Sequence, residues 1–378
     1  MNILILGGTG AMGVPLVKNL SEDATNNIYV TSRKKRKSEN NVQYIQGNAR
    51  EEIFLKEVLK SKEWDAIVDF IVHGENFQHI LPFILDSTKQ YVFISSARVY
   101  SESDTLITED TPRLLDVSKD REYLKTNEYA LAKARQENLL FNSGRNNFTI
   151  IRPSITYNNY RLQLGVLEKE NWLYRALHGR TIVFSNDIAD KVTTNTLGDD
   201  VAKGIASIIG QKEALNQAFH ITCNHSLKWR DILDIYLVVL EKHLGKKISV
   251  KYTEKSTNFK FKDKVYQIIY CRYFNRSYDN SKINQFCDVR LFAEPKKGLS
   301  DCLLTFLNNP SFDYIDWRIE ALNDRVVNEK TPLSEIPSLR NKTYYFLYRY
   351  NLIFMILPLR YAVKVLKLFK CNLHSHGK

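Results

Sequence analysis

The sequence predicts an α/β protein built on a doubly wound parallel sheet, and three observations carry this prediction. From Asn2 to Leu140, short apolar runs alternate with stretches whose apolar residues recur at helical spacing. The run 66–72 is almost entirely apolar, which is typical of a strand covered by helices on both faces. The 378 residues are 44% hydrophobic, which is enough for one full core and a second, smaller unit.

The first element joins an apolar strand to a helix through a glycine-rich turn. Strand 2–6 is followed directly by Gly7, Gly10 and Gly13, and apolar residues then recur at helical spacing over 14–20. This arrangement predicts a dinucleotide site, because the helix N-terminus offers unpaired N–H groups and a positive dipole end to phosphates. A glycine-rich loop without a ligand is the alternative interpretation. The cofactor-binding residues predicted in this turn are Gly7, Thr9, Gly10, Ala11, Met12 and Gly13.

Basic residues follow the second predicted strand, 28–31. An NAD-specific fold usually carries an acidic residue about 20 positions beyond the glycines, where it binds the ribose 2′-hydroxyl. Here the chain reads Thr-Ser-Arg-Lys-Lys-Arg-Lys over 31–37, with no carboxylate. Ser32 and Arg33 suit a 2′-phosphate, so NADP(H) is the favoured cofactor and NAD(H) is the alternative. A solvated basic loop is the competing interpretation, and it fits 35–37 best.

The following strands place candidate ligand-binding residues at their carboxyl ends. We expect strands over 42–46, 66–72 and 91–94, with helices over 51–61 and 76–87 between them. Ligands of doubly wound sheets bind at the carboxyl ends of the strands. The residues expected there are Asn48 and Ala49 beside the adenine, Phe70, Ile71 and Val72 beside the cofactor, and Ser96 after the fifth strand.

A tyrosine and a lysine one helical turn apart predict acid–base chemistry. Tyr129 and Lys133 lie in the stretch 127–140, which reads as one helix, so their side chains share a face. A nearby cation favours the phenolate, which makes the tyrosine a usable acid or base near neutral pH. Ser96 would hold the substrate oxygen while Tyr129 exchanges its proton. The same spacing recurs at 278–282, which we interpret as structural because it does not follow the fifth strand.

Further motifs accompany the glycine turn and the tyrosine–lysine pair. They read Ser-Ser-Ala-Arg-Val-Tyr at 95–100, Ile-Thr-Glu-Asp-Thr-Pro at 107–112, Phe-Thr-Ile-Ile-Arg-Pro at 148–153, Leu-Gly-Asp-Asp-Val-Ala at 197–202, Phe-His-Ile-Thr at 219–222, Tyr-Asp-Asn-Ser-Lys at 278–282 and Lys-Gly-Leu at 297–299. In combination they resemble the extended short-chain dehydrogenase/reductase family, also called the NAD-dependent epimerase/dehydratase family, over residues 1–308.

The resemblance implies a Rossmann-type sheet, a nicotinamide cofactor and a nucleotide-activated sugar as substrate. It also implies that Pro153 and Ile155, at the end of the sixth strand, border the nicotinamide. The reaction would be reduction of a keto group or epimerisation through a keto intermediate. The NADP(H) preference favours a reductase, because an epimerase regenerates its cofactor.

Departures from the family pattern bear on the reaction and the pocket. Sugar-nucleotide dehydratases of the family carry an Asp-Glu pair just after the strand-five hydroxyl, where this chain has Ala97 and Arg98, so dehydration is not expected. Ser101 stands where a glycine usually follows Val-Tyr, and Asn158 breaks the usual Tyr-Gly-Pro turn. We therefore expect a substrate pocket that differs from the family pattern.

The resemblance also implies a discontinuous substrate-binding lobe. The expected division is a Rossmann domain of 1–158 and 190–223, a lobe of 159–189 and 224–308, and a helical C-terminal extension of 309–378. Cations of the lobe would either grip a diphosphate or remain ordinary solvated side chains. They are Arg161, Lys169, Arg175, His178 and Arg180.

Charge and cysteine content restrict the partners. The net charge of +12 suits an anionic partner, which leaves phosphorylated small molecules, nucleic acid and anionic membranes. RNA binding on the same scaffold is the rival function, and it is disfavoured because the chain has no RGG tract or aromatic-basic platform.

Five widely spaced cysteines predict neither a disulfide framework nor a metal site, and the chain begins in a strand without room for a signal peptide. We expect a cytoplasmic protein.

The C-terminal segment has no counterpart in the family pattern. Residues 342–378 include seven Lys/Arg and no Asp or Glu. The apolar run 352–359 is too short to span a bilayer, which takes about 20 residues, and 360–370 reads as an amphipathic helix. One interpretation is a helix that packs on its own chain or on a second copy in a homodimer. The other is peripheral contact of 342–370 with the anionic inner face of a membrane.

Overall fold

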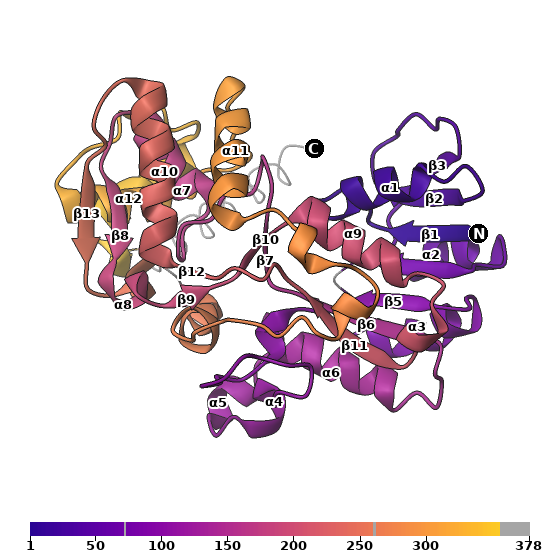
Figure 1. The fold of residues 1–378 in the computed structure, drawn as a ribbon. Coiled ribbons are helices and arrows are strands. Elements are labelled where there is room, and N and C mark those ends of the chain that lie inside the picture. The colour runs from indigo at the N-terminus through magenta and orange to yellow at the C-terminus, as the bar shows by residue number, and fades with distance from the viewer. Residues whose placement is uncertain (72, 260–261, 356–378) are drawn as a thin grey trace, which may run out of the picture.

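The computed structural model describes residues 1–71, 73–259 and 262–355. It consists of a sheet-based domain, a second lobe and a helical C-terminal region (Figure 1). Val72 and the helix expected over 360–370 lie outside the described residues. In the part of the chain that is described, no helix is both long and apolar enough to cross a bilayer.

Seven parallel strands form the central sheet, in the order β11-β6-β5-β4-β1-β2-β3. The strand order reverses between β1 and β4, and this switch point is where doubly wound sheets bind ligands. The strands are β1 (Asn2–Leu6), β2 (Asn27–Ser32), β3 (Val42–Gln46), β4 (Ala66–Asp69), β5 (Tyr91–Ile94), β6 (Phe148–Pro153) and β11 (Gln217–Ile221).

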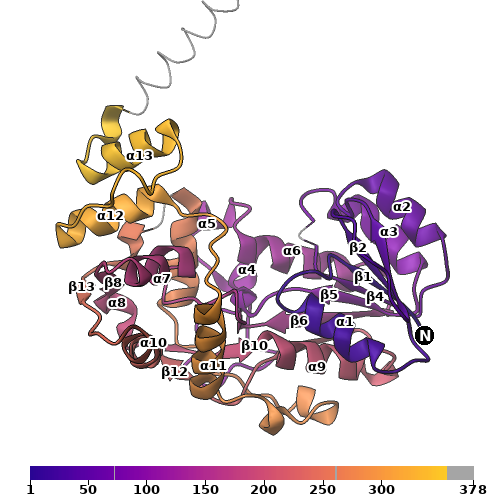
Figure 2. The same ribbon diagram turned by 90° about the horizontal axis from the view of Figure 1, so that it is seen from above.

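Helices cover both faces of the sheet, as the apolar strands predict (Figure 2). Leu16 of α1 and Val201 of α9 pack in the core on one face, whereas Leu55, Ile80 and Leu140 of α2, α3 and α6 pack on the other. The bounds are α1 (Gly13–Ser21), α2 (Glu52–Lys60), α3 (Phe77–Asp86), α6 (Tyr129–Phe141) and α9 (Gly198–Ile208). The predicted doubly wound Rossmann-type fold is confirmed.

The second lobe has its own apolar core, in which Trp172 stacks on Tyr236 with ring centroids 4.6 Å apart. Three two-stranded sheets belong to the lobe and to the segments that join it to the main sheet: β7 (Ile155–Tyr157) with β10 (Asn195–Leu197), β9 (Val192–Thr193) with β12 (Leu227–Lys228), and β8 (Ile182–Ser185) with β13 (Val250–Thr253). Its longer helices are α7 (Lys169–Leu177), α10 (Trp229–Leu244) and α11 (Pro295–Asn308).

The C-terminal region adds α12 (Trp317–Val327) and α13 (Leu339–Arg349), which pack beside each other on the lobe (Figure 2). Trp317, Leu322 and Tyr345 enter the apolar core of the lobe, so the region is part of that packed unit. Short elements complete the fold: η1 (Ala97–Val99), α4 (Leu114–Val117), α5 (Arg121–Leu124), α8 (Asn186–Ala189), η2 (Lys212–Ala214), η3 (Ser256–Phe259), η4 (Lys262–Val265), η5 (Ile268–Arg272), η6 (Ile283–Gln285), η7 (Val289–Leu291) and η8 (Ile353–Met355).

Candidate active site

The glycine turn between β1 and α1 has the shape of a phosphate cradle. Gly7 adopts a left-handed conformation with φ of +75° and donates its N–H to Thr31 Oγ1 at 3.0 Å. A side-chain carbon at Gly13 would lie 2.6 Å from the backbone of Gly8, so α1 can begin this close to the turn only with glycine there. At Gly10 a side-chain carbon would meet no atom within 4 Å, which leaves open space for a ligand. These features fit the phosphates of a dinucleotide.

The other residues predicted to bind the cofactor lie at the carboxyl ends of neighbouring strands. Ser32 ends β2 and is buried, whereas Arg33 after it is exposed. The Asn48 side-chain amide donates to Glu51 Oε1 at 3.0 Å, so part of its hydrogen-bonding capacity serves the start of α2. The remaining residues of this set are Ala49, which is buried after β3, and Phe70 and Ile71, which follow β4; Val72 lies outside the described residues.

Local caps position the predicted catalytic residues. Ser96 follows β5, and its Oγ accepts the backbone N–H of Arg98 at 3.2 Å, which starts η1. Tyr129 is the first residue of α6, and the carboxylate of Glu128 accepts a backbone N–H of that first turn at 2.8 Å. Lys133 stands one turn later on the same helix. Both caps lie on loops at the carboxyl edge of the sheet.

A cavity of about 350 Å³ brings Ser96 and Tyr129 together, whereas Lys133 is not part of its described lining. Ser96 and Tyr129 form part of its wall. Met12 from the glycine turn and Pro153 and Ile155 from the end of β6 line the same cavity. The residues expected beside the nicotinamide and the residues expected to handle the proton therefore face one space.

The second tyrosine with this spacing, Tyr278, also lines the cavity, and in both pairs the lysine stands outside the described lining. Lys282 directs its Nζ to the side-chain oxygen of Gln217, at 2.8 Å, and over the ring of Phe219. The Tyr278 hydroxyl contacts Ser154 Oγ at 3.4 Å and is buried. Tyr129 is 37% exposed, whereas Tyr278 is 8% exposed, so Tyr129 is the more accessible of the two as an acid or base.

Charges around Tyr129 shape its acidity. Burial raises the pKa of the Tyr129 phenol, whereas the charges of Arg98 and Arg161 and a hydrogen bond with Ser96 lower it. The Arg98 guanidinium lies 5.3 Å from the centroid of the Tyr129 ring and forms an ion pair with Glu128. Sequence reasoning assigned this effect to Lys133, but Arg98 is the neighbouring charge that acts most strongly on the phenol.

Lys133 occupies a buried position behind the cavity. Only 3% of its surface is exposed, and its Nζ lies 4.4 Å from the centroid of the Phe93 ring. Burial lowers the pKa of Lys133 to about 8, whereas the negative charges of Asp69 and Glu137 act in the opposite direction. The ammonium group is therefore mostly charged at neutral pH and loses its proton more readily than an exposed lysine.

Buried polar networks fix the strand ends that carry the site. Glu137 of α6 accepts hydrogen bonds from Ser95 Oγ at 2.6 Å and from the Arg152 guanidinium at 2.8 and 2.9 Å. Asp69 at the end of β4 accepts the Tyr91 hydroxyl at 2.8 Å and contacts a ring nitrogen of His73 at 2.7 Å. Because these groups are buried and hydrogen-bonded, they hold β4, β5, β6 and α6 in one arrangement.

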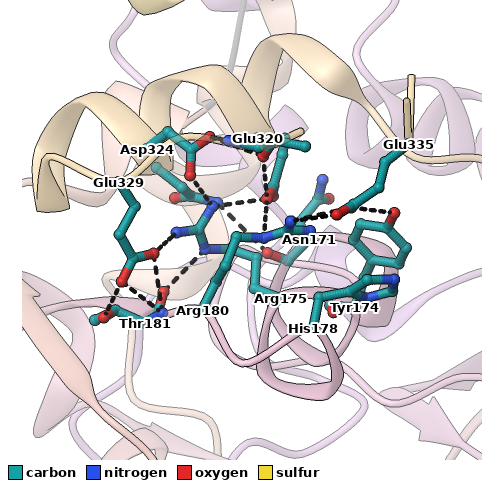
Figure 3. Close-up of polar contacts among 12 residues, drawn as sticks. Asn171, Tyr174, Arg175, His178, Arg180, Thr181, Glu320, Asp324, Glu329 and Glu335 are labelled. Carbon is teal, nitrogen blue, oxygen red and sulfur yellow. Dashed lines mark hydrogen bonds and ion pairs between the residues drawn. The ribbon is translucent and has the colours of Figure 1, made fainter. Parts of the chain in front are cut away.

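The expectation that cations of the lobe together grip a diphosphate is wrong for most of the set. Arg175 is fully buried and pairs with Glu320, Asp324 and Glu329 at 2.7–2.8 Å (Figure 3). The others turned away from the cavity are Arg180, which pairs with Glu320 and Glu335, Lys169, which pairs with Glu170, and His178, whose ring contacts the Tyr174 carbonyl. Of the five, Arg161 alone lines the cavity. The carboxylates that form ion pairs with Arg175 lie about 150 residues away in sequence, on or just after α12.

Sequence reasoning missed several residues of the cavity wall. Cys271, Arg272 and Arg276 line it, and they come from a segment that has no clear periodicity in the sequence. Arg98 was noticed only as a departure from the dehydratase pattern. Its position two residues after the strand-five serine was the available signal.

A doubly wound sheet, a glycine turn at the start of its first helix, and a serine and tyrosine beside the carboxyl ends of its strands are typical of the short-chain dehydrogenase/reductase fold. Residues 3–217 match the family described as the NAD dependent epimerase/dehydratase family. The match spans more than half of the chain, and the chain belongs to this family.

Solved structures of family enzymes share the fold. A dTDP-glucose 4,6-dehydratase from Bacillus anthracis, solved with NAD, is 18% identical with a TM-score of 0.61, and the match covers 82% of this chain and 97% of that chain. A UDP-glucuronic acid 4-epimerase from Bacillus cereus, solved with UDP-glucuronic acid and NAD, is 17% identical with a TM-score of 0.59, covering 81% of this chain and 100% of that chain. At these identities the likeness concerns the fold.

A curated relative is named for binding to stem-loops. The chloroplast stem-loop binding protein of 41 kDa b from Arabidopsis thaliana is 25% identical over 246 residues. The match covers 58% of this chain and 58% of that protein. The chain therefore spans under two thirds of the length of this relative.

Proposed function

We propose that the protein is an NAD(P)-dependent oxidoreductase that acts on a nucleotide-activated sugar, either as a keto-reductase or as an epimerase. The observation that carries the proposal is the convergence of Ser96 and Tyr129 with Met12, Pro153 and Ile155 on one cavity. The similar structures include enzymes solved with a nucleotide sugar and NAD. Ala97 and Arg98 stand where dehydratases carry their acidic pair, so dehydration is not proposed.

Each residue has a distinct role in this proposal. Ser96 hydrogen-bonds the sugar hydroxyl or keto oxygen and holds it near Tyr129 Oη. Tyr129 transfers the proton at that oxygen, and the positive charges of Arg98 and Arg161 lower the pKa of its phenol against the opposing effect of burial. Lys133 lies one turn away on α6. The nicotinamide ring, when bound between the glycine turn and the end of β6, supplies or accepts the hydride.

The first experiment identifies the cofactor and the direction of the reaction. The purified protein is denatured and the released nucleotide is identified by mass spectrometry, and the folded protein is then incubated with NADPH or NADH and a panel of nucleotide sugars. Stoichiometric consumption of reduced cofactor indicates a reductase, whereas isomerised sugar without net consumption indicates an epimerase. Absence of both cofactor binding and turnover across the panel would contradict the proposal.

We infer a preference for NADP(H) from the end of β2. Ser32 and Arg33 follow the strand, no carboxylate is present over 31–37, and Arg33 is exposed and available to a 2′-phosphate. The structural relatives solved with NAD do not argue for this preference. The preference therefore depends on the residues of this chain alone.

RNA binding is a second candidate, favoured by the Arabidopsis stem-loop binding relative and by the net charge of +12. The presence of Ser96, Tyr129 and Lys133 argues for the enzyme, because a binding scaffold has no use for that set. Filter binding to a structured RNA at increasing salt separates the two. RNA affinity that falls steeply with salt, together with an absence of turnover, would favour the rival.

We also propose peripheral contact with an anionic membrane through the C-terminal segment. Between Leu339 and Met355 the chain has no acidic residue, and large apolar side chains are exposed, including Leu339 at 82% and Phe354 at 73%. Positively charged and aromatic residues in one segment are typical of membrane-surface contact. Packing on a second copy of the chain in a homodimer is the alternative occupant of this surface.

Flotation with phosphatidylglycerol-containing and pure phosphatidylcholine vesicles tests the membrane contact. The truncated chain should end at Met355, because the Tyr345 hydroxyl of α13 bonds Asp324 at 2.6 Å and must be kept. We expect the full chain to float with anionic vesicles at low salt. The truncated chain keeps Leu339 and Phe354 but lacks the five basic residues of 356–378, so it should float less. Binding to neither vesicle, or a dimer that dissociates on truncation, would overturn the membrane proposal.

A further inference from the structure

Four arginines line the cavity that contains Tyr129, and only one of them has a carboxylate partner. Arg98 pairs with Glu128. Arg161, Arg272 and Arg276 form no ion pair within the described residues, and the described lining of the cavity includes no Asp or Glu. The cavity wall therefore carries an excess of positive charge.

Two of the unpaired arginines are buried, which makes their lack of a counter-charge significant. Arg272 and Arg276 are 3% and 4% exposed. Arg276 donates to the carbonyls of Tyr100 and Ser101 at 2.9 and 3.0 Å, and its Nε has no partner. Arg272 donates to the Gly165 carbonyl, to the Gln163 side chain and to a sulfur atom. Glu168 acts on Arg272 through its charge, but within the described residues neither arginine has a carboxylate in direct contact, and a buried cation without such a partner is destabilising.

The ionisation of two neighbouring groups reflects this positive potential. Burial raises the pKa of the Cys271 thiol, but the charges of Arg272, Arg276 and Arg98 outweigh it and bring the pKa below its ordinary value. Burial also lowers the pKa of the Arg272 guanidinium. Both directions are expected where positive charges are buried together, and both would be relieved by an anion in the cavity.

The positive charge lies at the reacting end of the cavity. Arg98 stands 5.3 Å from the centroid of the Tyr129 ring, and the charge of Arg161 also lowers the pKa of that phenol. Arg276 holds the backbone that directly follows η1. Because Tyr129 exchanges a proton at the sugar, these cations surround the sugar unit and not only the distant nucleotide.

We propose that the sugar unit bound beside Tyr129 carries a carboxylate, which Arg161 contacts directly and which Arg272 and Arg276 stabilise through their charge. This inference rests on the proposed function and names the class of its substrate, a nucleotide-activated sugar acid. Arg161 is exposed at the cavity and its guanidinium makes one hydrogen bond, to Thr156 Oγ1 at 3.1 Å, so donors remain free for a bidentate contact. A neutral sugar would leave the three charges uncompensated.

Anionic oxygens could also come from the diphosphate, and a matched pair of ligands separates the two sources. The holoprotein is first titrated calorimetrically with the diphosphates of uridine, thymidine, guanosine and adenosine to find the nucleotide that it binds. It is then titrated with that nucleotide attached to glucose and to glucuronic acid, which differ only at the carboxylate. We expect the glucuronic acid form to bind about tenfold more tightly or better.

Arg161→Met tests the contact itself, and Arg145→Met is its matched control, because Arg145 is an exposed arginine that pairs with Asp86 outside the cavity. We expect Arg161→Met to remove most of the preference for the acid and to leave binding of the glucose form within about twofold. Arg161→Lys should restore part of the preference. Arg145→Met should change neither titration.

The outcomes distinguish this inference from the proposed function. Equal binding of the acid and neutral forms, or a preference that survives in Arg161→Met, would overturn the sugar-acid inference while the enzyme assignment stands. Equal losses for both forms in Arg161→Met would assign the arginine to the diphosphate and would also overturn it. No binding of any nucleotide diphosphate would count against the proposed function and the inference together.

Discussion

The molecule contains two arginine clusters with opposite chemistry. Around Arg175 and Arg180, at the contact between the lobe and α12, every guanidinium faces carboxylates, with N···O distances of 2.7–3.1 Å (Figure 3). Around Arg272 and Arg276, in the wall of the cavity, guanidinium groups meet carbonyl oxygens and a thiol. In the first cluster both guanidinium groups have carboxylate partners, whereas in the second neither guanidinium forms an ion pair within the described residues.

This difference teaches how to separate structural from ligand-binding arginines. Both clusters are buried, so burial alone does not distinguish them. The presence of a carboxylate partner distinguishes them, because a buried cation without one destabilises the folded protein and is stabilised when an anion binds. The paired cluster fastens α12 and the following loop to α7, and the unpaired cluster marks the site.

The largest expected effect comes from breaking the paired cluster. Arg175→Met would leave Glu320, Asp324 and Glu329 buried or half-buried without their shared cation. We expect a loss of about 3–5 kcal/mol in the free energy of unfolding, measured by urea denaturation. Arg145→Met, which removes an exposed pair, should cost less than about 1 kcal/mol. Similar losses in both variants would mean that the cluster contributes no more than a surface pair.

At the cavity, substitution should change turnover and leave the fold unchanged. Tyr129→Phe keeps the ring and removes the hydroxyl, so we expect turnover to fall by about two orders of magnitude or more with little change in cofactor affinity. Tyr278→Phe is the matched control in the same cavity, and it should lower turnover far less. Equal losses at both positions would show that the wrong tyrosine was assigned.

The two clusters also show how far sequence reasoning reaches. The sheet, the glycine turn and the Tyr129–Lys133 pair could be predicted because each depends on local spacing within one strand–turn–helix unit. The partners of Arg175 could not, because α7 and α12 are about 150 residues apart and only the folded chain brings them together. Arg272 and Arg276 were missed for a related reason: their segment is irregular, and their position in the wall depends on packing against residues 100–101.

Arg33 is an exposed arginine that forms no ion pair within the described residues. The anion proposed for it is the 2′-phosphate of NADP(H). Arg33→Ala should weaken NADPH binding by about 1.5–3 kcal/mol, the size of a hydrogen bond to a charged group, with little effect on NADH. Fluorescence titration of both cofactors measures this difference. Lys35→Ala, in the same exposed loop, should have a smaller effect. Equal losses for NADPH and NADH would show that Arg33 does not contact the 2′-phosphate.

The last expected effect is a pH dependence with opposite signs for activity and stability. Lys133 has a pKa of about 8 in the folded protein, below the usual 10.5. As pH rises through about 8, Lys133, one helical turn after Tyr129, loses its charge, so kcat/KM should fall by about tenfold per pH unit above that value. Between about pH 8 and 10.5 the unfolded chain binds the proton more tightly, so this group adds stability as pH rises. Lys133→Arg keeps the charge, so the pH at which kcat/KM begins to fall should be higher in this variant. Lys133→Met has no titrating group, so the rise in stability between about pH 8 and 10.5 should disappear. If kcat/KM of Lys133→Arg still falls above about pH 8, the titrating group is another residue of the site.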